Sequence, residues 1–248
     1  MKIAFITDIH EDIISLKNAF RIIDKLSVNE VVCLGDISGF SAPNYKYLRT
    51  RNAHECLRLI RENCKYVIIG NHDIHAAQII PKNCNFFNFP ENWYQLDYHD
   101  RYSLAGDKLW MHEEYDLNPL YKLEDIEYLK SLPEYIICNM GGVNILLTHY
   151  IYPNILGLKR EFYTYADEFR KHFVFMKEKG CVLSFTGHSH VNGFFISTGK
   201  SLKYYKYTSK VLNQNSFCFG LPPITCNNKR SGFSIFDTEE YKIKAVRF

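Results

Sequence analysis

Five short peptides bring together Asp, Asn and His side chains, which are the types that bind metal ions. They are Thr7-Asp8-Ile9-His10, Gly35-Asp36, Gly70-Asn71-His72-Asp73, Thr148-His149 and Gly187-His188-Ser189-His190. Singly, most have an ordinary interpretation, since Asp8 and Asp36 could belong to simple turns and His149 to a hydrogen-bonded strand end. The last peptide is more specific, because two imidazoles on one loop form a natural chelate.

A mixed set of carboxylate, amide and imidazole ligands favours first-row transition metals over calcium. Two divalent cations bring about four positive charges and two aspartates return about two negative ones. Such a centre stays cationic and attracts phosphate. Two cations about 3.5–4 Å apart can also clamp the attacking and leaving oxygens of an in-line displacement at phosphorus. The set therefore indicates hydrolysis of a phosphate ester.

Each of these peptides directly follows a short apolar segment that is typical of a buried strand. The predicted strands are Lys2–Thr7, Val31–Leu34, Tyr66–Ile69, Val143–Thr148 and Val182–Thr186. Ligands of parallel-sheet proteins bind beyond the carboxyl ends of the strands. The pattern therefore predicts that all five peptides lie on one edge of a parallel sheet.

Helical periodicity predicts helices between these strands. They are a helix that Asp12 caps, with Ile13, Leu16, Phe20 and Ile23 on one face, and helices over about 45–63, Leu123–Leu132 and Tyr163–Lys179. Residues 35–44 are predicted to be a loop, and residues 81–120 show no sustained period. Hairpin-like strands are predicted at Phe194–Ser197, Tyr204–Tyr207, Phe233–Phe236 and Ile243–Phe248.

The composition narrows the class of protein. The 248 residues include 46% hydrophobic residues and carry a formal net charge of +3, which suits a globular α/β protein and does not indicate a nucleic-acid or membrane partner. The first apolar segment is interpreted as a strand rather than a signal peptide. The eight cysteines are scattered without a CxxC pair, which predicts reduced thiols in a cytoplasmic protein.

In this order, the five peptides resemble the calcineurin-like metallophosphoesterase superfamily, whose pattern is DxH, GD, GNH[DE], [GT]H and GHxH. Gly35-Asp36-Ile37-Ser38-Gly39-Phe40, followed by Pro43-Asn44, is most similar to a bacterial and archaeal branch of small phosphodiesterases related to diadenosine tetraphosphatase. The resemblance implies a four-layer α-β-β-α sandwich with two mixed β-sheets. We expect a single domain over residues 1–248, with a cap insertion at about 81–135.

The resemblance also implies a role for each residue. Asp8, His10 and His190 would bind a first metal ion, and Asn71, His149 and His188 a second. Asp36 would bridge the two ions, which are expected to be Mn, with Fe, Zn and Ni as alternatives. His72 would protonate the leaving oxygen as a general acid after attack by a hydroxide that the two metals share.

Two departures from the family pattern stand out. Glu11-Asp12 replaces the Gly-Asn that often follows the first motif, which makes this loop more acidic at the approach to the site. Gly39 stands where related protein phosphatases carry an aspartate that orients the catalytic histidine, and no arginine follows it. This argues against a phosphoprotein phosphatase and leaves the orienting partner of His72 open.

Some further polar and aromatic residues match no motif. Tyr150 is expected either to line the pocket or to pack near it. Five histidines are interpreted as surface or packing residues: His54, His75, His99, His112 and His172.

The sequence thus predicts a dinuclear metal-dependent phosphoesterase that hydrolyses a phosphodiester or phosphomonoester. The expected substrate is a small or nucleotide-like molecule. Two alternatives belong to other classes. One is a non-catalytic scaffold that keeps the fold, and the other is a nuclease, which the near-neutral charge disfavours because backbone binding uses many Lys and Arg contacts.

Overall fold

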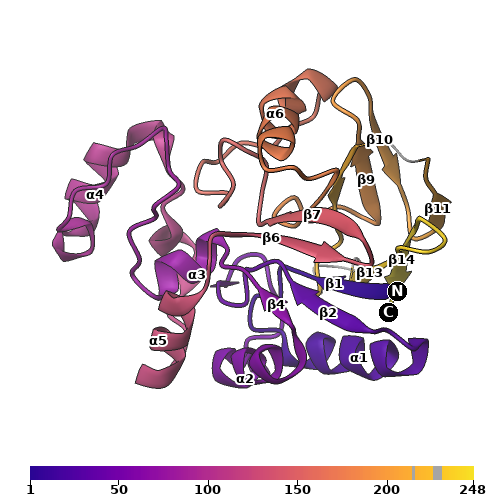
Figure 1. Cartoon of the computed structure of the whole chain (residues 1–248). Coiled ribbons are helices and arrows are strands. Elements are labelled where there is room, and N and C mark those ends of the chain that lie inside the picture. Colours follow the sequence, from indigo (N-terminus) through magenta and orange to yellow (C-terminus); the bar gives the residue numbers. More distant parts are fainter. Residues whose placement is uncertain (214–215, 226–230) are drawn as a thin grey trace.

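The computed structural model describes residues 1–213, 216–225 and 231–248. Two six-stranded mixed sheets form its centre. Figure 1 shows α1 (Ile13–Ile23) and α2 (Ala53–Asn63) below the first sheet and α6 (Arg170–Glu178) above the second. The predicted α-β-β-α sandwich with two mixed sheets is therefore confirmed. No helix within these described ranges is long and apolar enough to cross a membrane.

The first sheet contains both ends of the chain. Its order is β11 (Ser209–Val211), β14 (Lys242–Arg247), β13 (Gly232–Asp237), β1 (Lys2–Ile6), β2 (Glu30–Cys33) and β4 (Tyr66–Val67). Strands β1, β2 and β4 run parallel, as their alternation with helices predicts, whereas β13 pairs with β1 in the antiparallel sense.

The second sheet is made from the middle of the chain. Its order is β10 (Leu202–Tyr205), β9 (Phe194–Ser197), β12 (Phe217–Gly220), β8 (Leu183–Thr186), β7 (Val143–Thr148) and β6 (Tyr135–Met140). Strands β7, β8 and β12 are parallel neighbours, and the outer strands are antiparallel.

The main core lies between the two sheets, and the period of two in β1 explains how it is built. Ile3 and Phe5 of β1 pack toward the second sheet, whereas Ala4 and Ile6 pack toward α1 and α2. Phe5 stacks on Phe185 of β8, with ring centroids 4.0 Å apart. Burying each such side chain stabilises the fold by about 1.5–3 kcal/mol.

Two predicted helix starts are wrong for the same reason. The helix expected from about residue 45 begins at Ala53, where the side chain of Asn52 accepts a hydrogen bond from the Glu55 amide at 2.9 Å. The helix expected from Tyr163 becomes regular only at Arg170. Before α2, Tyr45 lines the pocket, and before α6, Ala166–Phe169 form a single 3-10 turn whose Phe169 is buried. Tertiary packing overrides helical propensity at both places.

The residues between α3 (Asn71–Ala76) and α5 (Leu123–Ser131) lie outside both large sheets. They form α4 (Tyr98–Ala105), which Figure 1 shows to one side of the molecule, and β5 (Asp116–Leu117). Strand β5 pairs with β3 (Phe40–Ser41), inside the segment predicted to be a loop. Trp93, Leu109 and Met111 pack this segment against α3 and the residues after β7.

Candidate metal centre

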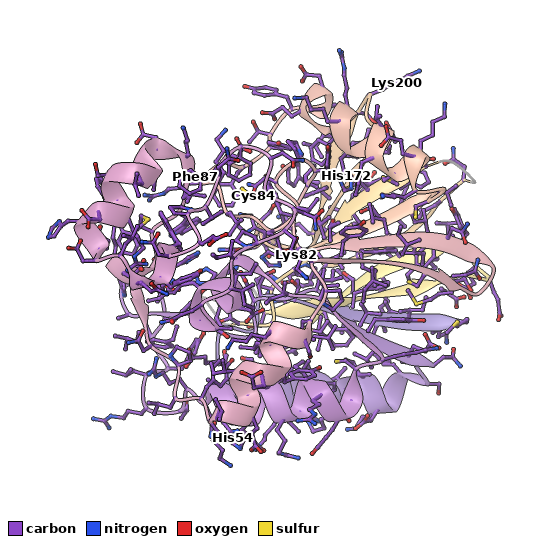
Figure 2. The ribbon with its side chains drawn as sticks, turned by 60° about the vertical axis from the view of Figure 1, so that its left-hand side comes forward. His54, Lys82, Cys84, Phe87, His172 and Lys200 are labelled. Atoms are coloured by element: carbon purple, nitrogen blue, oxygen red, sulfur yellow. The ribbon has the colours of Figure 1, made fainter. Side chains whose placement is uncertain are left out.

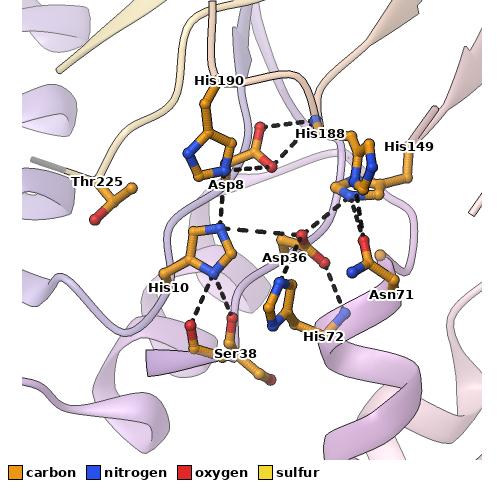
Figure 3. Close-up of polar contacts among 12 residues, drawn as sticks. Asp8, His10, Asp36, Ser38, Asn71, His72, His149, His188, His190 and Thr225 are labelled. Carbon is orange, nitrogen blue, oxygen red and sulfur yellow. Dashed lines mark hydrogen bonds and ion pairs between the residues drawn. The ribbon is translucent and has the colours of Figure 1, made fainter. Parts of the chain in front are cut away.

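The five motif peptides converge at the carboxyl ends of their strands, as predicted, but the strands belong to two sheets. Three peptides follow β1, β2 and β4 of the first sheet, and two follow β7 and β8 of the second. The expectation of one parallel-sheet edge is therefore wrong. The sheets stack so that these strand ends meet, and Figure 3 shows the side chains that gather there.

The backbone that presents these side chains is strained. Five of the motif residues adopt positive φ: Asp8 (52°), His10 (47°), Asp36 (54°), His188 (63°) and His190 (44°). Each such non-glycine residue costs about 1–3 kcal/mol, and strain of this kind concentrates at functional sites. The loops are held by backbone hydrogen bonds, since the amides of Ile9 and His10 both donate to the Asp36 carbonyl at 2.7 and 3.0 Å.

A first group of potential ligand atoms comes from Asp8, His10 and His190. Nε2 of His10 lies 3.1 Å from Nε2 of His190, which lies 3.3 Å from Oδ1 of Asp8. Two atoms that bind one cation at about 2.1 Å are separated by about 3 Å, so these spacings suit a metal ion. The Ser38 and Gly39 carbonyls lie 3.1 and 3.0 Å from Nδ1 of His10. This nitrogen therefore carries the proton, and the Nε2 lone pair faces the site.

A second group comes from Asn71, His149 and His188. Oδ1 of Asn71 lies 3.1 Å from both Nε2 of His149 and Nδ1 of His188. Nδ1 of His149 donates to the Leu34 carbonyl at 2.7 Å, which again leaves Nε2 free to bind. Nε2 of His188 is buried and has no hydrogen-bond partner among the residues that the structure describes.

Asp36 lies between the two groups. Its Oδ2 is 3.1 Å from Nε2 of His149 and 4.0 Å from Nε2 of His10. Burial alone would raise the pKa of Asp36, but the surrounding imidazoles, His149 first, hold it well below its usual range. Burial would likewise lower the pKa of His149, yet Asp36 raises it to about 9. Asp36 is therefore a buried anion that needs cations around it.

These donors fit a metal centre on their own chemistry. Three clusters of potential ligand atoms within 4.8 Å of one another contain only motif residues: Asp8, His10 and His190; His10, Asp36 and His72; and Asp36, His149 and His188. Nδ1 of His188 and Nε2 of His149 both lie 3.1 Å from Oδ1 of Asn71, as two ligands of one cation would. A pair of cations would satisfy these atoms and neutralise the two carboxylates.

Asp73, the last residue of the third motif, has a structural role. Its carboxylate accepts hydrogen bonds from the Ser38 amide at 2.8 Å and the Gly70 amide at 3.1 Å. Gly70 must lack a side chain, because a Cβ there would collide with Oδ1 of Asp36. Asp73 thus fixes the start of α3 to the loop after β2, which sets Asn71 and His72 against Asp36.

The sequence reasoning missed two residues beside His72. Asp116 Oδ2 lies 2.5 Å from His72 Nδ1. The ring of His112, interpreted as surface or packing, lies 4.4 Å from that of His72 and is buried. Both residues come from the segment without periodicity, and β5 is only two residues long, so no sequence pattern could have marked them.

The other unassigned residues have packing or surface roles. His172, a residue of α6, is fully buried, and His54, in the first turn of α2, pairs with Asp125; Figure 2 labels both histidines. Tyr150 packs behind His188, with ring centroids 4.5 Å apart, and its hydroxyl accepts a hydrogen bond from the Tyr163 amide. Of the two expectations for Tyr150, the structure favours packing.

The acidic residues after the first motif do not face the substrate side as free charges. Asp12 is the N-cap of α1, where it accepts a hydrogen bond from the Ser15 amide at 3.0 Å. Glu11 is buried and lies 3.5 Å from the guanidinium of Arg51. This departure from the family pattern therefore stabilises the loop.

A pocket of about 410 Å³ opens over the cluster. His10, Asp36, His72, His188 and His190 form its floor. Its walls carry aromatic rings and one guanidinium: Tyr45, Trp110, Tyr115, Phe162 and Arg160. The guanidinium of Arg160 lies over the Trp110 ring, 5.5 Å from its centroid. The pocket therefore joins a polar floor to walls that suit a planar group and a negative charge.

Two stacked mixed sheets with a carboxylate and imidazole cluster at their meeting ends place the chain among metal-binding α/β sandwich proteins. A family model described as calcineurin-like phosphoesterase matches residues 1–192. The chain belongs to this family, as the motifs indicate, and the family implies a metal-dependent phosphoesterase that uses divalent metal ions.

Individual relatives are more distant. Over 260 residues the chain is 27% identical to an uncharacterised protein of Methanocaldococcus jannaschii, covering 99% of this chain and 86% of that protein. A metallophosphoesterase structure from Sphaerobacter thermophilus gives a TM-score of 0.67 at 19% identity, covering 100% of this chain and 87% of that one. A structure provisionally named a diadenosine tetraphosphatase gives 0.54 at 15% identity, covering 99% and 93%. These two structural likenesses show the fold.

Proposed function

We propose that this protein hydrolyses a phosphate ester, either a phosphodiester or a phosphomonoester, with the help of two divalent transition-metal ions. The position of Asp36 carries the proposal. Its carboxylate approaches both His10 on one side and His149 on the other, at 4.0 and 3.1 Å. An aspartate so placed suits a bridge between two cations.

The proposed ligands divide into two sets. Asp8, His10 and His190 hold one ion, Asn71, His149 and His188 hold the other, and Asp36 contacts both. Imidazole nitrogens mixed with oxygen ligands support Mn first, with Fe, Zn and Ni as alternatives. When bound, such ions attract the negative phosphate and lower the pKa of bound water toward neutral pH.

His72 is the proposed general acid. It lies at the floor of the pocket, and its Nε2 faces the cluster at 3.9 Å from Oδ2 of Asp36. An imidazolium there can give its Nε2 proton to the leaving oxygen as the P–O bond breaks. Without metal ions, burial alone would lower the pKa of His72, but Asp116 and then Asp36 raise it to about 9.

The dimensions and walls of the pocket support a small or nucleotide-like substrate. A volume of about 410 Å³ suits a molecule of metabolite size. Trp110 and Phe162 offer ring faces, and Arg160 offers a cation for a second anionic group. Trp110, Tyr115 and Asp116 come from the segment at about 81–135, so we assign this segment the role of a cap that shapes the pocket.

The compartment is part of the proposal. All the cysteines within the described residues are free thiols, and most are buried. Cys226 lies outside the described residues. Reduced thiols are typical of the cytoplasm, where we place the enzyme.

The first test is hydrolysis by Mn-loaded protein. p-Nitrophenyl phosphate, bis(p-nitrophenyl) phosphate, cyclic nucleotides and dinucleoside polyphosphates should be screened with Mn and with excess chelator. We expect turnover of at least one of these esters that chelation abolishes. Protein with two metal ions per chain that hydrolyses none of them would refute the proposal.

His72→Ala tests the role of the general acid. The variant should lose roughly 10²–10⁴-fold in kcat, the usual contribution of a positioned proton donor. Its metal content should match that of the wild type, because His72 is not among the proposed ligands. Unchanged turnover would remove His72 from the mechanism.

A further inference from the structure

The imidazole of His72 is held by a carboxylate that belongs to no sequence motif. Its Nδ1 lies 2.5 Å from Oδ2 of Asp116, whose side chain is only 6% exposed. An ionised carboxylate can only accept hydrogen bonds, so Nδ1 of His72 donates. Nε2, the nitrogen on the opposite side of the ring, is then the one that faces the cluster.

The pairing of β3 with β5 brings Asp116 to this place. Ser41 of β3 stands opposite Asp116 in the antiparallel register, and the Ala42 amide donates to the Tyr115 carbonyl at 3.2 Å. Strand β3 begins four residues after Asp36. The same stretch of backbone therefore fixes both carboxylates that lie on either side of His72.

Gly39 explains why the carboxylate comes from another segment. In related protein phosphatases an aspartate stands at this position, but here φ of Gly39 is +94° and the ring of His72 packs directly against its Cα. A Cβ would collide with Nδ1 of His72. No side chain fits at position 39, and Asp116 reaches the same ring nitrogen from the side of β5.

We propose that Asp116 is the positioning residue of His72. The two residues form a hydrogen-bonded histidine–aspartate pair that is assembled from two distant parts of the chain. The inference rests on the proposed function. As the P–O bond to the leaving group breaks, the Nε2 proton of His72 moves to the leaving oxygen. The Nδ1 proton stays between His72 and Asp116, the ring becomes neutral, and Asp116 remains an anion throughout.

An alternative role for Asp116 is to hold a further cation together with His72 and His112. These three residues do form a cluster of potential ligand atoms, and Nδ1 of His112 lies 3.5 Å from Oδ2 of Asp116. The separation of 2.5 Å between Asp116 and His72 argues against it. Two ligands of one ion are about 3 Å apart, so this shorter contact is a direct hydrogen bond.

The test compares two esters that differ in their need for a proton. p-Nitrophenolate leaves readily without one, whereas phenolate does not. In Asp116→Asn we expect kcat for phenyl phosphate to fall roughly 10–100-fold and kcat for p-nitrophenyl phosphate to fall by less than about threefold, with KM unchanged. Adding Asp116→Asn to His72→Ala should change neither rate further, because both act through one proton.

Asp107→Asn is the matched control, since Asp107 is an exposed aspartate of the same segment. It should leave both rates as in the wild type. An equal loss for both esters in Asp116→Asn would overturn the proposal. So would a metal content of three ions per wild-type chain that falls to two in this variant, because Asp116 would then be a metal ligand.

A second measurement does not need turnover. In ¹⁵N-histidine-labelled protein loaded with Zn, the Nδ1 proton of His72 should give a downfield resonance, which Asp116→Asn removes and Asp107→Asn keeps. If the wild type hydrolyses no ester but this resonance behaves as expected, the proposed function fails and the pairing of His72 with Asp116 stands. If an ester is hydrolysed but the resonance is absent or insensitive to Asp116→Asn, the proposed pairing is wrong and the proposed function still stands.

Discussion

Asp36 combines a buried negative charge with a strained backbone conformation. It is almost fully buried, adopts φ of 54° and lies among three histidines. Aspartate tolerates a left-handed backbone better than most residues, because its short side chain can bond locally. The strain and the buried charge are both costs to folding. A cation on either side of the carboxylate would offset them, which is why we expect this position to be sensitive to substitution.

Asp36→Asn tests this expectation. The amide keeps the shape of the side chain and can still accept the His72 amide at Oδ1, but it removes the charge that offsets the cations. We expect metal content to fall from two ions per chain to at most one, with the remaining affinity at least roughly 10–100-fold weaker. Elemental analysis after dialysis measures the metal content, and titration calorimetry measures the remaining affinity. Asp107→Asn is again the control, and two tightly bound ions in Asp36→Asn would contradict a bridging role.

At the residue scale, much of the candidate site was readable from the sequence because each motif residue directly follows a short buried strand. The eight motif positions that the sequence singled out, from Asp8 to His190, do meet in one cluster. Asp116 could not be found in this way. Its position depends on the pairing of β3 with β5, and a two-residue strand leaves no periodic signal.

At the element scale, the predictions succeeded where apolar residues recur at the spacing of a helix or a strand. The helix that Asp12 caps begins as predicted, since Ile13, Leu16 and Ile23 form a continuous buried stripe, although Phe20 is only partly buried. Strands β6 and β12 were missed, and β11 as well. The stacking of two sheets was implied by the family resemblance and not by periodicity, which says nothing about which strands share a sheet.

Helix α6 is attached to the second sheet partly through a buried histidine. Nδ1 of His172 accepts the Tyr152 amide at 3.0 Å, so Nε2 carries the proton and donates to Ser184 of β8 at 2.9 Å. Protonation would place a second donor against the Tyr152 amide. Burial accordingly lowers the pKa of His172 to about 3.

This pKa predicts how stability depends on pH. The folded pKa lies below the unfolded value of 6.5, so the contribution of His172 is fully present above pH 6.5 and is lost as pH falls toward 3. At pH 5 the loss is about 2 kcal/mol. His172→Gln should be less stable than the wild type at pH 7 by about 1–3 kcal/mol, and that gap should narrow by about 2 kcal/mol at pH 5.

Urea unfolding of metal-free protein at the two pH values measures this effect. Ser184→Ala is the control, because it removes the hydrogen-bond partner and keeps the buried imidazole. Its stability should fall with pH as steeply as that of the wild type. A gap between His172→Gln and the wild type that is the same at both pH values would show that His172 does not titrate in this range.

At the scale of the whole molecule, the candidate centre joins the two sheets. Asp8, His10, Asp36 and Asn71 follow strands of the first sheet, whereas His149, His188 and His190 follow strands of the second. In the protein alone, polar contacts already cross this boundary, among them the His188 amide donating to Asp8 at 3.0 Å and Nδ1 of His149 donating to the Leu34 carbonyl at 2.7 Å. Cations held by ligands from both sheets would therefore act as cross-links between them.

Metal binding should consequently stabilise the entire fold. Ions present at about 100 times their dissociation constant stabilise the folded state by about 2.7 kcal/mol for each site. For a chain of this size one such site corresponds to a rise in Tm of about 5–10 °C, and a second adds to it. Differential scanning calorimetry with Mn and with chelator measures the difference. Because the four proposed histidine ligands must be neutral to bind, the rise should shrink as pH falls and vanish near pH 4.

The size of the Mn-dependent rise in Tm in single-site variants shows whether the ion links the two sheets or is held by one of them. His190→Ala removes a ligand of the second sheet from the first group, whereas Asp8→Asn weakens the first-sheet side of the same group. If the ion joins the sheets, either substitution should remove most of the Mn-dependent rise that this group contributes, because binding then needs ligands from both. A variant without His190 that keeps the whole rise in Tm would mean that the first sheet holds this ion alone and that the ion does not link the two sheets.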